Sequence, residues 1–356
     1  MSNPVSIINT DLEYQTAALQ DVSRTFALTI PQLPEALQHV VGNAYLLCRI
    51  ADTIEDDIGI STDAKGRFAE QFIQVVTGEE APTTFADALV PMLTASTSAA
   101  EHDLIRNAPR VLRITAGFTP QQRQELARCV RIMSRGMTDF QRRPNPHGVS
   151  DLEAFNRYCY YVAGVVGEML TGLFCAYSPE IDKQRHRLEQ LAISFGAALQ
   201  MTNILKDIWE DQKRGACWLP RDLFAQQGVQ LQELSKRKHR AAFHRGMQQL
   251  IALATGHLLN GLDYVLLIPP HETGIRRFCL WALGMAALTL RKVNANPGFT
   301  SGQSVKISRR AVRFTIVTTN LLASHDRLLR YWFTLIIGDL PKAERPSMQA
   351  LSRCRK

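Results

Sequence analysis

The sequence lacks the cysteine and histidine patterns that hold disulfides or structural metals. Its seven cysteines are odd in number, scattered and never spaced as C-x-x-C, and its nine histidines contain no H-x-x-x-H pair. Disulfide frameworks use even numbers of cysteines, and zinc sites use close pairs of cysteine or histidine. The sequence therefore argues against a disulfide-stapled domain and against a zinc site, and it indicates a reducing compartment.

Long apolar runs are also missing. A helix needs about 20 consecutive apolar residues to span a bilayer, and the nearest run, Tyr331–Gly338, is far shorter. Residues Met1–Gln20 are polar and acidic, without the apolar core of a signal peptide. We therefore expect a cytoplasmic protein without a transmembrane helix, whose contact with the inner face of the cell membrane is peripheral, through the basic C-terminal segment and residues 331–337.

Acidic residues are too few to balance the basic ones, so the chain carries a net charge of +8. Such a surface attracts nucleic acid, anionic lipid or a polyanionic substrate. No aromatic residues are interleaved with the basic ones, as base stacking requires, and no nucleic-acid-binding motif is present. A nucleic-acid partner is therefore not expected, and an anionic substrate and a membrane surface remain.

Helical periodicity is what the sequence has in abundance. Apolar residues recur every three or four positions, while strand-like alternation is scarce. The pattern predicts helices over 40–58, 121–140, 151–174, 188–211, 231–267, 276–293 and 308–337. Residues 79–100, with Thr, Ser, Ala and Pro, are expected to form a mobile surface excursion. No linker divides the chain, so we predict one all-α domain over 1–356, with flexible tails at 1–20 and 341–356.

Two acidic runs share one spacing. Asp52-Thr-Ile-Glu-Asp56-Asp57 and Asp207-Ile-Trp-Glu-Asp211 each place aspartates at i and i+4, which lie on one face of a helix. Like charges at that distance are unfavourable unless a cation lies between them. Mg²⁺ binds through a few carboxylates together with phosphate oxygens. Each run taken alone is more often a solvated helix end, but the matched pair predicts a metal-lined site for a diphosphate.

The helix that contains Tyr158-Cys-Tyr-Tyr-Val-Ala-Gly164-Val-Val-Gly167 holds two glycines, each of which costs a helix roughly 1 kcal/mol relative to alanine. Two interpretations remain open, close packing of small residues against another helix and a flat wall beside a long hydrocarbon. Leu199, Gln200 and Asn203 precede the second acidic run and extend the same lining. A diphosphate site above a dry apolar tunnel is what a prenyl diphosphate requires, because water would quench a carbocation.

Several stretches together resemble the squalene synthase branch of the squalene/phytoene synthase family, the head-to-head prenyltransferases. They are Ser23-Arg-Thr-Phe26, Tyr45-Leu-Leu-Cys-Arg49 with the first acidic run, Tyr158-Cys-x-Tyr-Val-Ala-Gly164, Asn203-Ile-Leu-Lys-Asp207 with the second run, and Gly302-x-x-x-Lys306-Ile. The resemblance covers about residues 20–310 and implies an isoprenoid-synthase-type helical bundle around a central apolar cavity. Because the chain lacks the membrane-spanning tail of eukaryotic members, it is similar to the bacterial type.

The resemblance also implies roles for single residues. The Mg²⁺ ligands would be Asp52, Glu55, Asp56, Asp207, Glu210 and Asp211. Diphosphate oxygens would be bound by Arg24, Arg49, Asn203 and Lys206. Tyr158 would act in the first half-reaction. The cavity would be lined by Phe26, Tyr45, Val162, Val166, Leu170, Phe195, Leu199, Gln200 and Phe278. NADPH would be bound by Lys306 and Arg309.

The implied activity is a farnesyl-diphosphate farnesyltransferase of isoprenoid biosynthesis. Two farnesyl diphosphates would join to presqualene diphosphate, which NADPH would then reduce to squalene. Two alternatives remain open. In the first, the enzyme omits the reduction and makes dehydrosqualene or phytoene. In the second, the chain is a non-catalytic assembly factor of the same fold. A monomer or weak homo-oligomer is expected.

Overall fold

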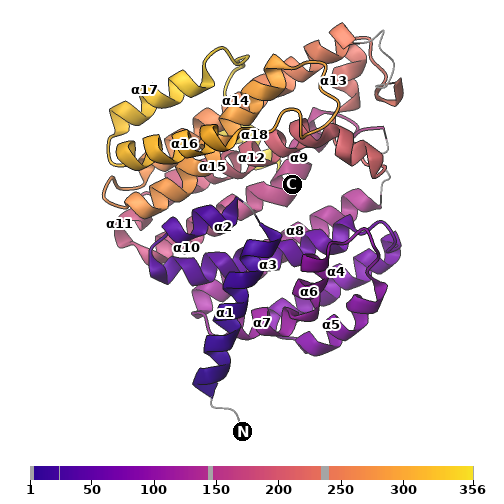
Figure 1. Ribbon diagram of the computed structural model, residues 1–356, viewed down its shortest axis with the longest axis vertical. Coiled ribbons are helices and arrows are strands. Elements are labelled where there is room, and N and C mark those ends of the chain that lie inside the picture. The colour runs from indigo at the N-terminus through magenta and orange to yellow at the C-terminus, as the bar shows by residue number, and fades with distance from the viewer. Residues whose placement is uncertain (1–3, 24, 143–146, 234–239, 356) are drawn as a thin grey trace. The chain divides into compact units, whose positions relative to one another are not determined.

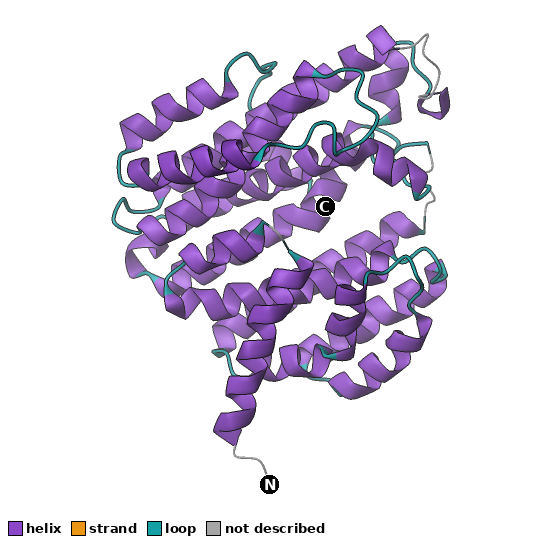
Figure 2. Cartoon of the chain, in the orientation of Figure 1, coloured by secondary structure: helices purple, strands orange, loops and turns teal. Residues whose placement is uncertain are grey.

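The computed structural model is helical throughout the residues that it describes, 4–23, 25–142, 147–233 and 240–355 (Figure 1). Within these ranges no strand forms, and the one β-contact is an isolated bridge between Val149 and Pro220 (Figure 2). The predicted all-α class is confirmed. The backbone contacts divide the chain into two compact units, of which one is Met1–Arg143 with Met169–Asp182 and the other is Pro144–Glu168 with Lys183–Lys356. The predicted single domain and its central cavity stay predictions.

The first unit is built around α3, whose apolar residues are buried between the neighbouring helices. Its helices are α1 (Pro4–Val22), α2 (Phe26–Thr29), α3 (Glu35–Asp56), α4 (Thr62–Thr77), α5 (Pro82–Leu89), α6 (Ala99–Arg106), α7 (Ala108–Ala116), α8 (Pro120–Gln141) and α11 (Pro179–Asp182), with 3₁₀ turns at Ile30–Gln32 and Val90–Met92. Val40, Leu47 and Ile50 of α3 are fully buried, and α3 packs against α1, α7 and α8. This core fixes the helix whose last turn carries the first acidic run.

The second unit is centred on α12, which packs along α14 and α15. Its helices are α9 (Leu152–Cys159), α12 (Arg185–Lys213), α13 (Arg221–Gln226), α14 (Arg240–Leu267), α15 (Thr273–Ala295), α16 (Arg309–Leu322), α17 (Asp326–Ile337) and α18 (Met348–Arg353), with a π turn at Tyr160–Gly164 and a 3₁₀ turn at Leu231–Glu233. Helix α10 (Val165–Tyr177) contributes residues to both units. The second acidic run therefore lies at the end of the most contacted helix of its unit.

Three sequence predictions of local structure were wrong. Residues 79–100 contain α5 and a 3₁₀ turn, with Phe85 and Leu89 fully buried, so this stretch belongs to the core. The range 308–337 is two helices, because the chain turns between Leu322 and Asp326. The expected tails at 1–20 and 341–356 instead contain α1, which packs on α3 and α7, and α18, which packs on α12.

Two helical stretches, Leu152–Tyr177 and Ala241–Leu267, are long and apolar enough to cross a membrane. The sequence prediction counted only uninterrupted apolar runs and so missed them. In each, 72% of the most apolar window is buried inside the protein. Core helices have this property, so length and composition alone do not make either stretch a membrane span.

Candidate functional site

The first acidic run lies in the last turn of α3, where Asp52 and Arg49 share one face. The Arg49 Nη1 atom is 3.8 Å from Asp52 Oδ2 and 3.8 Å from Glu101 Oε1 of α6. Burial raises the pKa of the Asp52 carboxyl to about 6, helped by the charges of Asp56 and Glu101 and opposed by Arg49. Asp52 therefore carries a charge that its own protein surroundings do not fully neutralise.

Glu55 points into the protein from the same helix. Its side chain is buried, and burial together with the charges of Asp56 and Asp52 raises its pKa well above the usual range. The buried ammonium of Lys65 from α4 donates to the Glu55 backbone carbonyl and lies 3.4 Å from Gln141 Oε1. Burial lowers the pKa of Lys65. Lys65 belongs to no sequence motif, because its partners Glu55 and Gln141 come from other helices.

Asp57, the last acid of the run, has a structural role. Its carboxylate is 1% exposed and accepts hydrogen bonds from the backbone N–H groups of Gly59 and Thr94, at 2.9 and 2.8 Å. The hydroxyls of Thr94 and Thr97 donate to it at 2.9 and 2.7 Å. Burial alone would raise the pKa of Asp57, but these hydrogen bonds lower it to about 2. Asp57 therefore anchors the end of α3 to the loop before α6.

Aromatic and basic groups continue from the first run toward the start of the chain. The guanidinium of Arg49 donates to the Tyr45 hydroxyl at 3.0 Å and lies 5.7 Å from the centre of its ring. The rings of Phe26 and Tyr45 are 5.0 Å apart, and the Ser23 hydroxyl accepts from the Phe26 N–H at 3.0 Å. The structure thus brings Phe26, Tyr45 and Arg49 together. Arg24, predicted to bind diphosphate, lies outside the described residues.

The second acidic run lies near the end of α12 and departs from regular helix. Asp207 has non-helical backbone angles (φ −101°, ψ 15°), so Asp207 and Asp211 are not the regular i, i+4 pair that the sequence predicts. The Lys206 ammonium lies 2.9 Å from Asp207 Oδ2, and Arg214 Nη2 lies 3.4 Å from Asp211 Oδ1. Each aspartate of this run therefore has a cation of its own.

Glu210 holds a turn from far along the chain. Both of its carboxylate oxygens accept from the Gly302 N–H, at 3.1 Å each. A Cβ atom at position 302 would lie 2.6 Å from Asp207 Oδ1 and 3.2 Å from the Lys206 carbonyl oxygen, so any other residue would require the Asp207 carboxylate or the turn to shift. The Gly302-x-x-x-Lys306 segment is therefore seated directly on the second acidic run.

Tyr158 is buried at the end of α9, immediately before the π turn Tyr160–Gly164. Its ring stacks on Trp218 with centroids 3.7 Å apart and an interplanar angle of 9°. Such wide turns shift the register of all residues that follow, and they recur at functional sites. Tyr158, Val162 and Val166, which are spaced at i+4 steps in the sequence, therefore do not form the single stripe of a regular α-helix. Trp218 was not predicted, since it follows α12 in sequence and carries no motif.

Gly167 of this segment and Gly196 of α12 allow the two stretches of backbone to pack closely. A Cβ atom on Gly167 would lie 2.1 Å from the Ala192 carbonyl oxygen, and one on Gly196 would lie 1.9 Å from that of Ala163. Backbones this close leave no room for a hydrocarbon between them. At Gly167 the packing interpretation is therefore correct and the flat-wall interpretation is wrong.

The remaining predicted lining residues differ in exposure. Phe195 is buried and stacks on Tyr264 at 5.4 Å, and Phe278 and Leu170 are also buried. Four other side chains are half-buried, those of Val162, Val166, Leu199 and Gln200. The side chain of Asn203 is exposed. Their shared role as a cavity wall stays a prediction.

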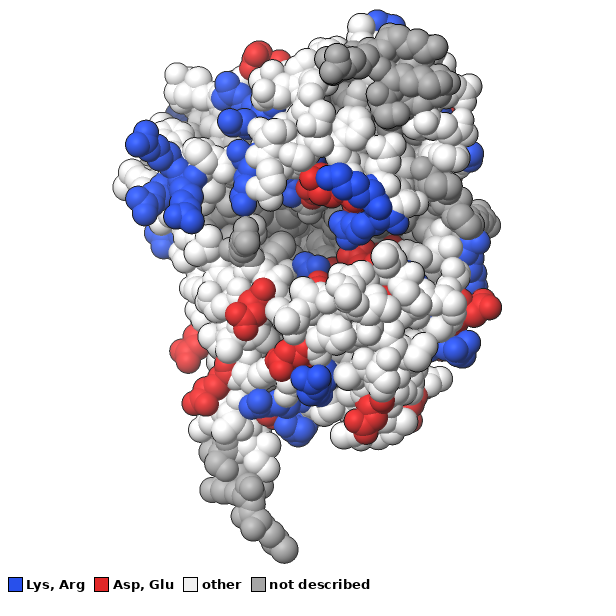
Figure 3. Space-filling view, turned by 45° about the vertical axis from the view of Figure 1, so that its right-hand side comes forward, with Lys and Arg blue, Asp and Glu red and all other residues white. Residues whose placement is uncertain are grey.

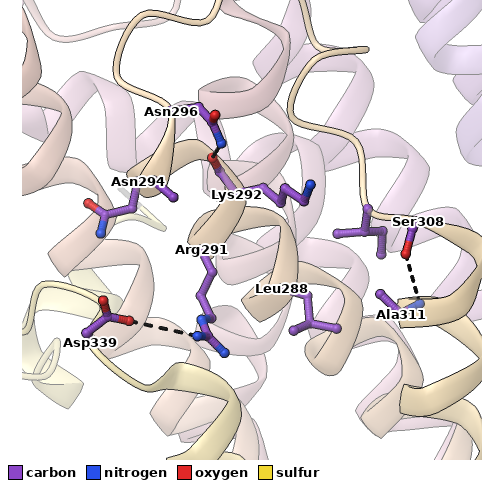
Figure 4. A pocket seen from close by; sticks show the side chains of 10 residues that line it. Leu288, Arg291, Lys292, Asn294, Asn296, Ser308, Ala311 and Asp339 are labelled. Atoms are coloured by element: carbon purple, nitrogen blue, oxygen red, sulfur yellow. Dashed lines mark hydrogen bonds and ion pairs between the residues drawn. The ribbon is translucent and has the colours of Figure 1, made fainter.

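A pocket of about 420 Å³ lies where α15 ends and α16 begins (Figure 4). Arg291 and Lys292 line it from α15, Ser308 and Ala311 from the start of α16, and Asp339 lies 4.0 Å from Arg291. Figure 4 shows Lys292 extending from α15 toward the start of α16. Lys306 and Arg309, predicted from sequence, are exposed neighbours of this pocket and do not line it.

The acidic runs have the chemistry of incomplete Mg²⁺ sites. Within the described ranges, no three side chains of His, Cys, Asp or Glu come close enough to hold a metal by themselves. Mg²⁺ is commonly bound by one or two carboxylates together with substrate phosphates. The raised pKa values of Asp52 and Glu55 mark negative charge that a cation would stabilise. The residues present therefore fit a metal that arrives with a phosphate ligand.

Comparisons with known proteins extend these observations. A family model described as squalene/phytoene synthase matches residues 19–311. Squalene synthase ERG9 of Candida albicans is 31% identical over 319 residues, covering 88% of this chain and 68% of that protein. Squalene synthase BSS of Botryococcus braunii is 28% identical over 322 residues, covering 87% and 65%. The solved structure of TcSQS with the ligand BPH1237 has a TM-score of 0.77 at 23% identity, covering 97% of this chain and 96% of that one.

Proposed function

Because this chain belongs to the squalene/phytoene synthase family, we propose that it is a squalene synthase. It joins two farnesyl diphosphates to presqualene diphosphate and reduces this with NADPH to squalene. The squalene synthases among its relatives support the activity. The observation that carries the reductive step is the Gly302 turn, which seats the Lys306 segment on the second acidic run.

We propose that Asp52, Asp56, Asp207 and Asp211 hold Mg²⁺ against the substrate diphosphates, with Glu55 and Glu210 in support. Mg²⁺ bound there supplies the positive charge that stabilises a departing diphosphate. Arg49 is held by Tyr45, Asp52 and Glu101, so its remaining N–H groups are oriented before substrate arrives. Lys206 and Asn203 would bind further diphosphate oxygens, Lys206 by leaving Asp207 once a metal replaces it.

Tyr158 is proposed to act in the first half-reaction. Stacking on Trp218 fixes its ring, and the hydroxyl would move a proton or stabilise positive charge as the two substrates join. Tyr158→Phe keeps the ring and its stacking. It should lower presqualene diphosphate formation by about 100-fold, within the range for loss of an acid–base group, while farnesyl diphosphate affinity changes little. Normal formation of presqualene diphosphate would mean that the ring only packs.

We propose that Lys306 and Arg309 bind the phosphates of NADPH, with Arg291 and Lys292 as further cations in the adjoining pocket. Lys306→Ala should raise the NADPH concentration needed for half-maximal squalene formation and leave the first half-reaction intact. Lys292→Ala serves as the comparison. If only Lys292→Ala raises this concentration, the cofactor binds in the pocket and the Lys306 assignment fails.

Product analysis tests the proposed function. Purified full-length protein is incubated with farnesyl diphosphate and Mg²⁺, with or without NADPH, and the extract is examined by mass spectrometry. Squalene with NADPH and presqualene diphosphate or other unreduced products without it are expected. The same unreduced hydrocarbon under both conditions would identify a dehydrosqualene or phytoene synthase. Absence of diphosphate release would favour the non-catalytic alternative.

A further inference from the structure

Helices α16 and α17 share an exposed apolar surface, which we call the α16–α17 apolar face. On each helix three large apolar side chains recur at i, i+3 and i+7, which places them on one side. The six residues are Phe314, Val317, Leu321, Leu328, Tyr331 and Leu335, and each is between 49% and 71% exposed. Surface helices ordinarily carry polar residues on this side.

The opposite sides of α16 and α17 are packed against the protein, so the α16–α17 apolar face belongs to folded, fixed helices. Thr315 and Thr319 of α16 and Trp332 and Phe333 of α17 are buried, and both helices pack on α15. The fully buried Arg276 donates to the Ala323 carbonyl at 2.9 Å and to Asp326 at 2.6 Å, which fixes the turn between the helices. The outward apolar residues therefore do not belong to the buried core. Exposed apolar patches of this kind mark interaction surfaces.

Cationic side chains accompany this face. Residues 309–337 contain five arginines and a single acid, Asp326, which Arg276 already holds. Arg330 is paired with Asp263, whereas Arg313 and Arg327 are exposed and have no carboxylate partner within the part of the chain that the structure describes. Figure 3 shows basic side chains gathered in clusters on the face that it draws. An anionic partner fits this arrangement.

We propose that the α16–α17 apolar face docks on an anionic lipid surface, with Leu321, Tyr331 and Leu335 entering the headgroup region and Arg313 and Arg327 binding lipid phosphates. Apolar and cationic contacts together give reversible attachment without a spanning helix. The inference does not depend on the proposed reaction, although a lipid surface would also receive a product as apolar as squalene.

This face replaces the membrane contact expected from sequence. Within residues 331–337, Trp332, Phe333, Ile336 and Ile337 are buried in the second unit. At the C-terminal end, Arg355 lies 2.7 Å from Glu168 and is already paired. Of the apolar residues in the predicted stretch 331–337, Tyr331 and Leu335 remain exposed and available to lipid.

Co-sedimentation of the full-length protein with vesicles tests the proposal. Phosphatidylcholine vesicles are compared with vesicles that also contain phosphatidylglycerol. Two double variants are used, Leu321→Ser with Tyr331→Ser and Arg313→Gln with Arg327→Gln. The control is Ile8→Ser, which removes an exposed apolar residue of α1, 54% exposed, in the first unit. Wild type and control should bind the anionic vesicles and be released by salt, and each double variant should bind about tenfold more weakly or worse.

Three results would overturn the proposal. The first is equal binding of the wild type to both kinds of vesicle, and the second is equal binding by the wild type and the double variants. The third is self-association of the wild type in sedimentation equilibrium that the apolar double variant abolishes, because the face then binds a second copy of the chain. Unchanged far-UV circular dichroism of both variants shows that a loss of binding is not a loss of fold, and diphosphate release from farnesyl diphosphate is measured separately.

Discussion

Asp52 and Asp57 belong to one acidic run, but their pKa values are shifted in opposite directions. The pKa of Asp52 is raised to about 6 because partial burial and the charges of Asp56 and Glu101 outweigh the effect of Arg49. The pKa of Asp57 is lowered to about 2 because N–H and O–H donors surround it. Sequence places both on the same motif and cannot separate them, because the donors Thr94 and Thr97 come from a distant loop. The first aspartate is available to a cation, and the second holds the helix end in place.

Asp52→Asn should lower turnover while it stabilises the fold. The folded pKa, about 6, lies above the ordinary 3.8, so ionisation of Asp52 destabilises the folded state as pH rises through this interval. Removing the charge should therefore raise the free energy of unfolding at pH 8, measured with urea, and lower turnover by about 100-fold, as for other groups that stabilise transition-state charge.

Asp207→Asn should lower turnover similarly without the gain in stability, because Lys206 already pairs with Asp207. Asp63→Asn, at an exposed acid in the first turn of α4, is the control for both variants. Near-wild-type turnover of either variant at saturating substrate would remove that run from the metal assignment.

Asp57→Asn should destabilise the protein by about 2–3 kcal/mol at pH 7. Lowering the pKa of a carboxyl from 3.8 to about 2 on folding corresponds to that free energy. A group with a depressed folded pKa contributes stability above its unfolded pKa and loses it as pH falls. The difference in unfolding free energy between wild type and variant should therefore narrow between about pH 5 and pH 2. A difference that stays constant over this range would show that lost packing, and not the charge, is responsible.

At the scale of elements, long amphipathic helices could be predicted and their interruptions could not. Helices α3, α8 and α15 lie within a few residues of the ranges expected from periodicity, because each buries one continuous stripe. The π turn after Tyr158 and the Asp207 break leave hydrophobic periodicity nearly unchanged, so they leave no signal in it. The break between α16 and α17 depends on Arg276, which lies outside both helices. The family and the acidic runs were recognised from motifs, while Lys65, Glu101 and Trp218 became visible only through their three-dimensional partners.

Gly302→Ala should uncouple the two half-reactions. The added Cβ would lie 2.6 Å from Asp207 Oδ1 and 3.2 Å from the Lys206 carbonyl, so either the Asp207 carboxylate or the turn that carries Lys306 must move. We expect the ratio of squalene to accumulated presqualene diphosphate to fall about tenfold, at a stability cost of about 1–3 kcal/mol, as is usual for overpacking.

Gly298→Ala is the matched control for that variant, because a Cβ at position 298 meets no atom within 4 Å. Equal product ratios for the two variants would show that the seat on the second acidic run does not matter for reduction.

At the scale of the whole molecule, each compact unit has its own apolar core and carries one acidic run. We therefore expect the buried helices to supply the stability without a metal, unlike in small metal-folded domains. The excess positive charge of the chain lies outside these cores, and part of it is gathered on α16 and α17. The proposed reaction and the proposed membrane contact are thus assigned to separate groups of residues.

Chelation should abolish turnover and leave the fold intact. With EDTA, the far-UV circular dichroism at 222 nm, a general helix signal, should be unchanged, because each unit is held together by its own buried apolar side chains. Diphosphate release should stop and should return when Mg²⁺ is added in excess. A large loss of helical signal on chelation would show that a metal contributes to folding, and full activity in EDTA would exclude the proposed role of Mg²⁺.

The contact between Gly302 and Glu210 would make the two proposed binding events, of Mg²⁺ and of NADPH, thermodynamically interdependent. Anything that changes the charge or position of Glu210 is felt by the Gly302 N–H, and so by the segment proposed to hold NADPH. Linkage is reciprocal, so a cation that changes NADPH affinity by some factor must have its own affinity changed by NADPH by the same factor. If that factor favours binding, an enzyme without its metal holds the reductant weakly, and hydride is kept for complexes that already contain substrate.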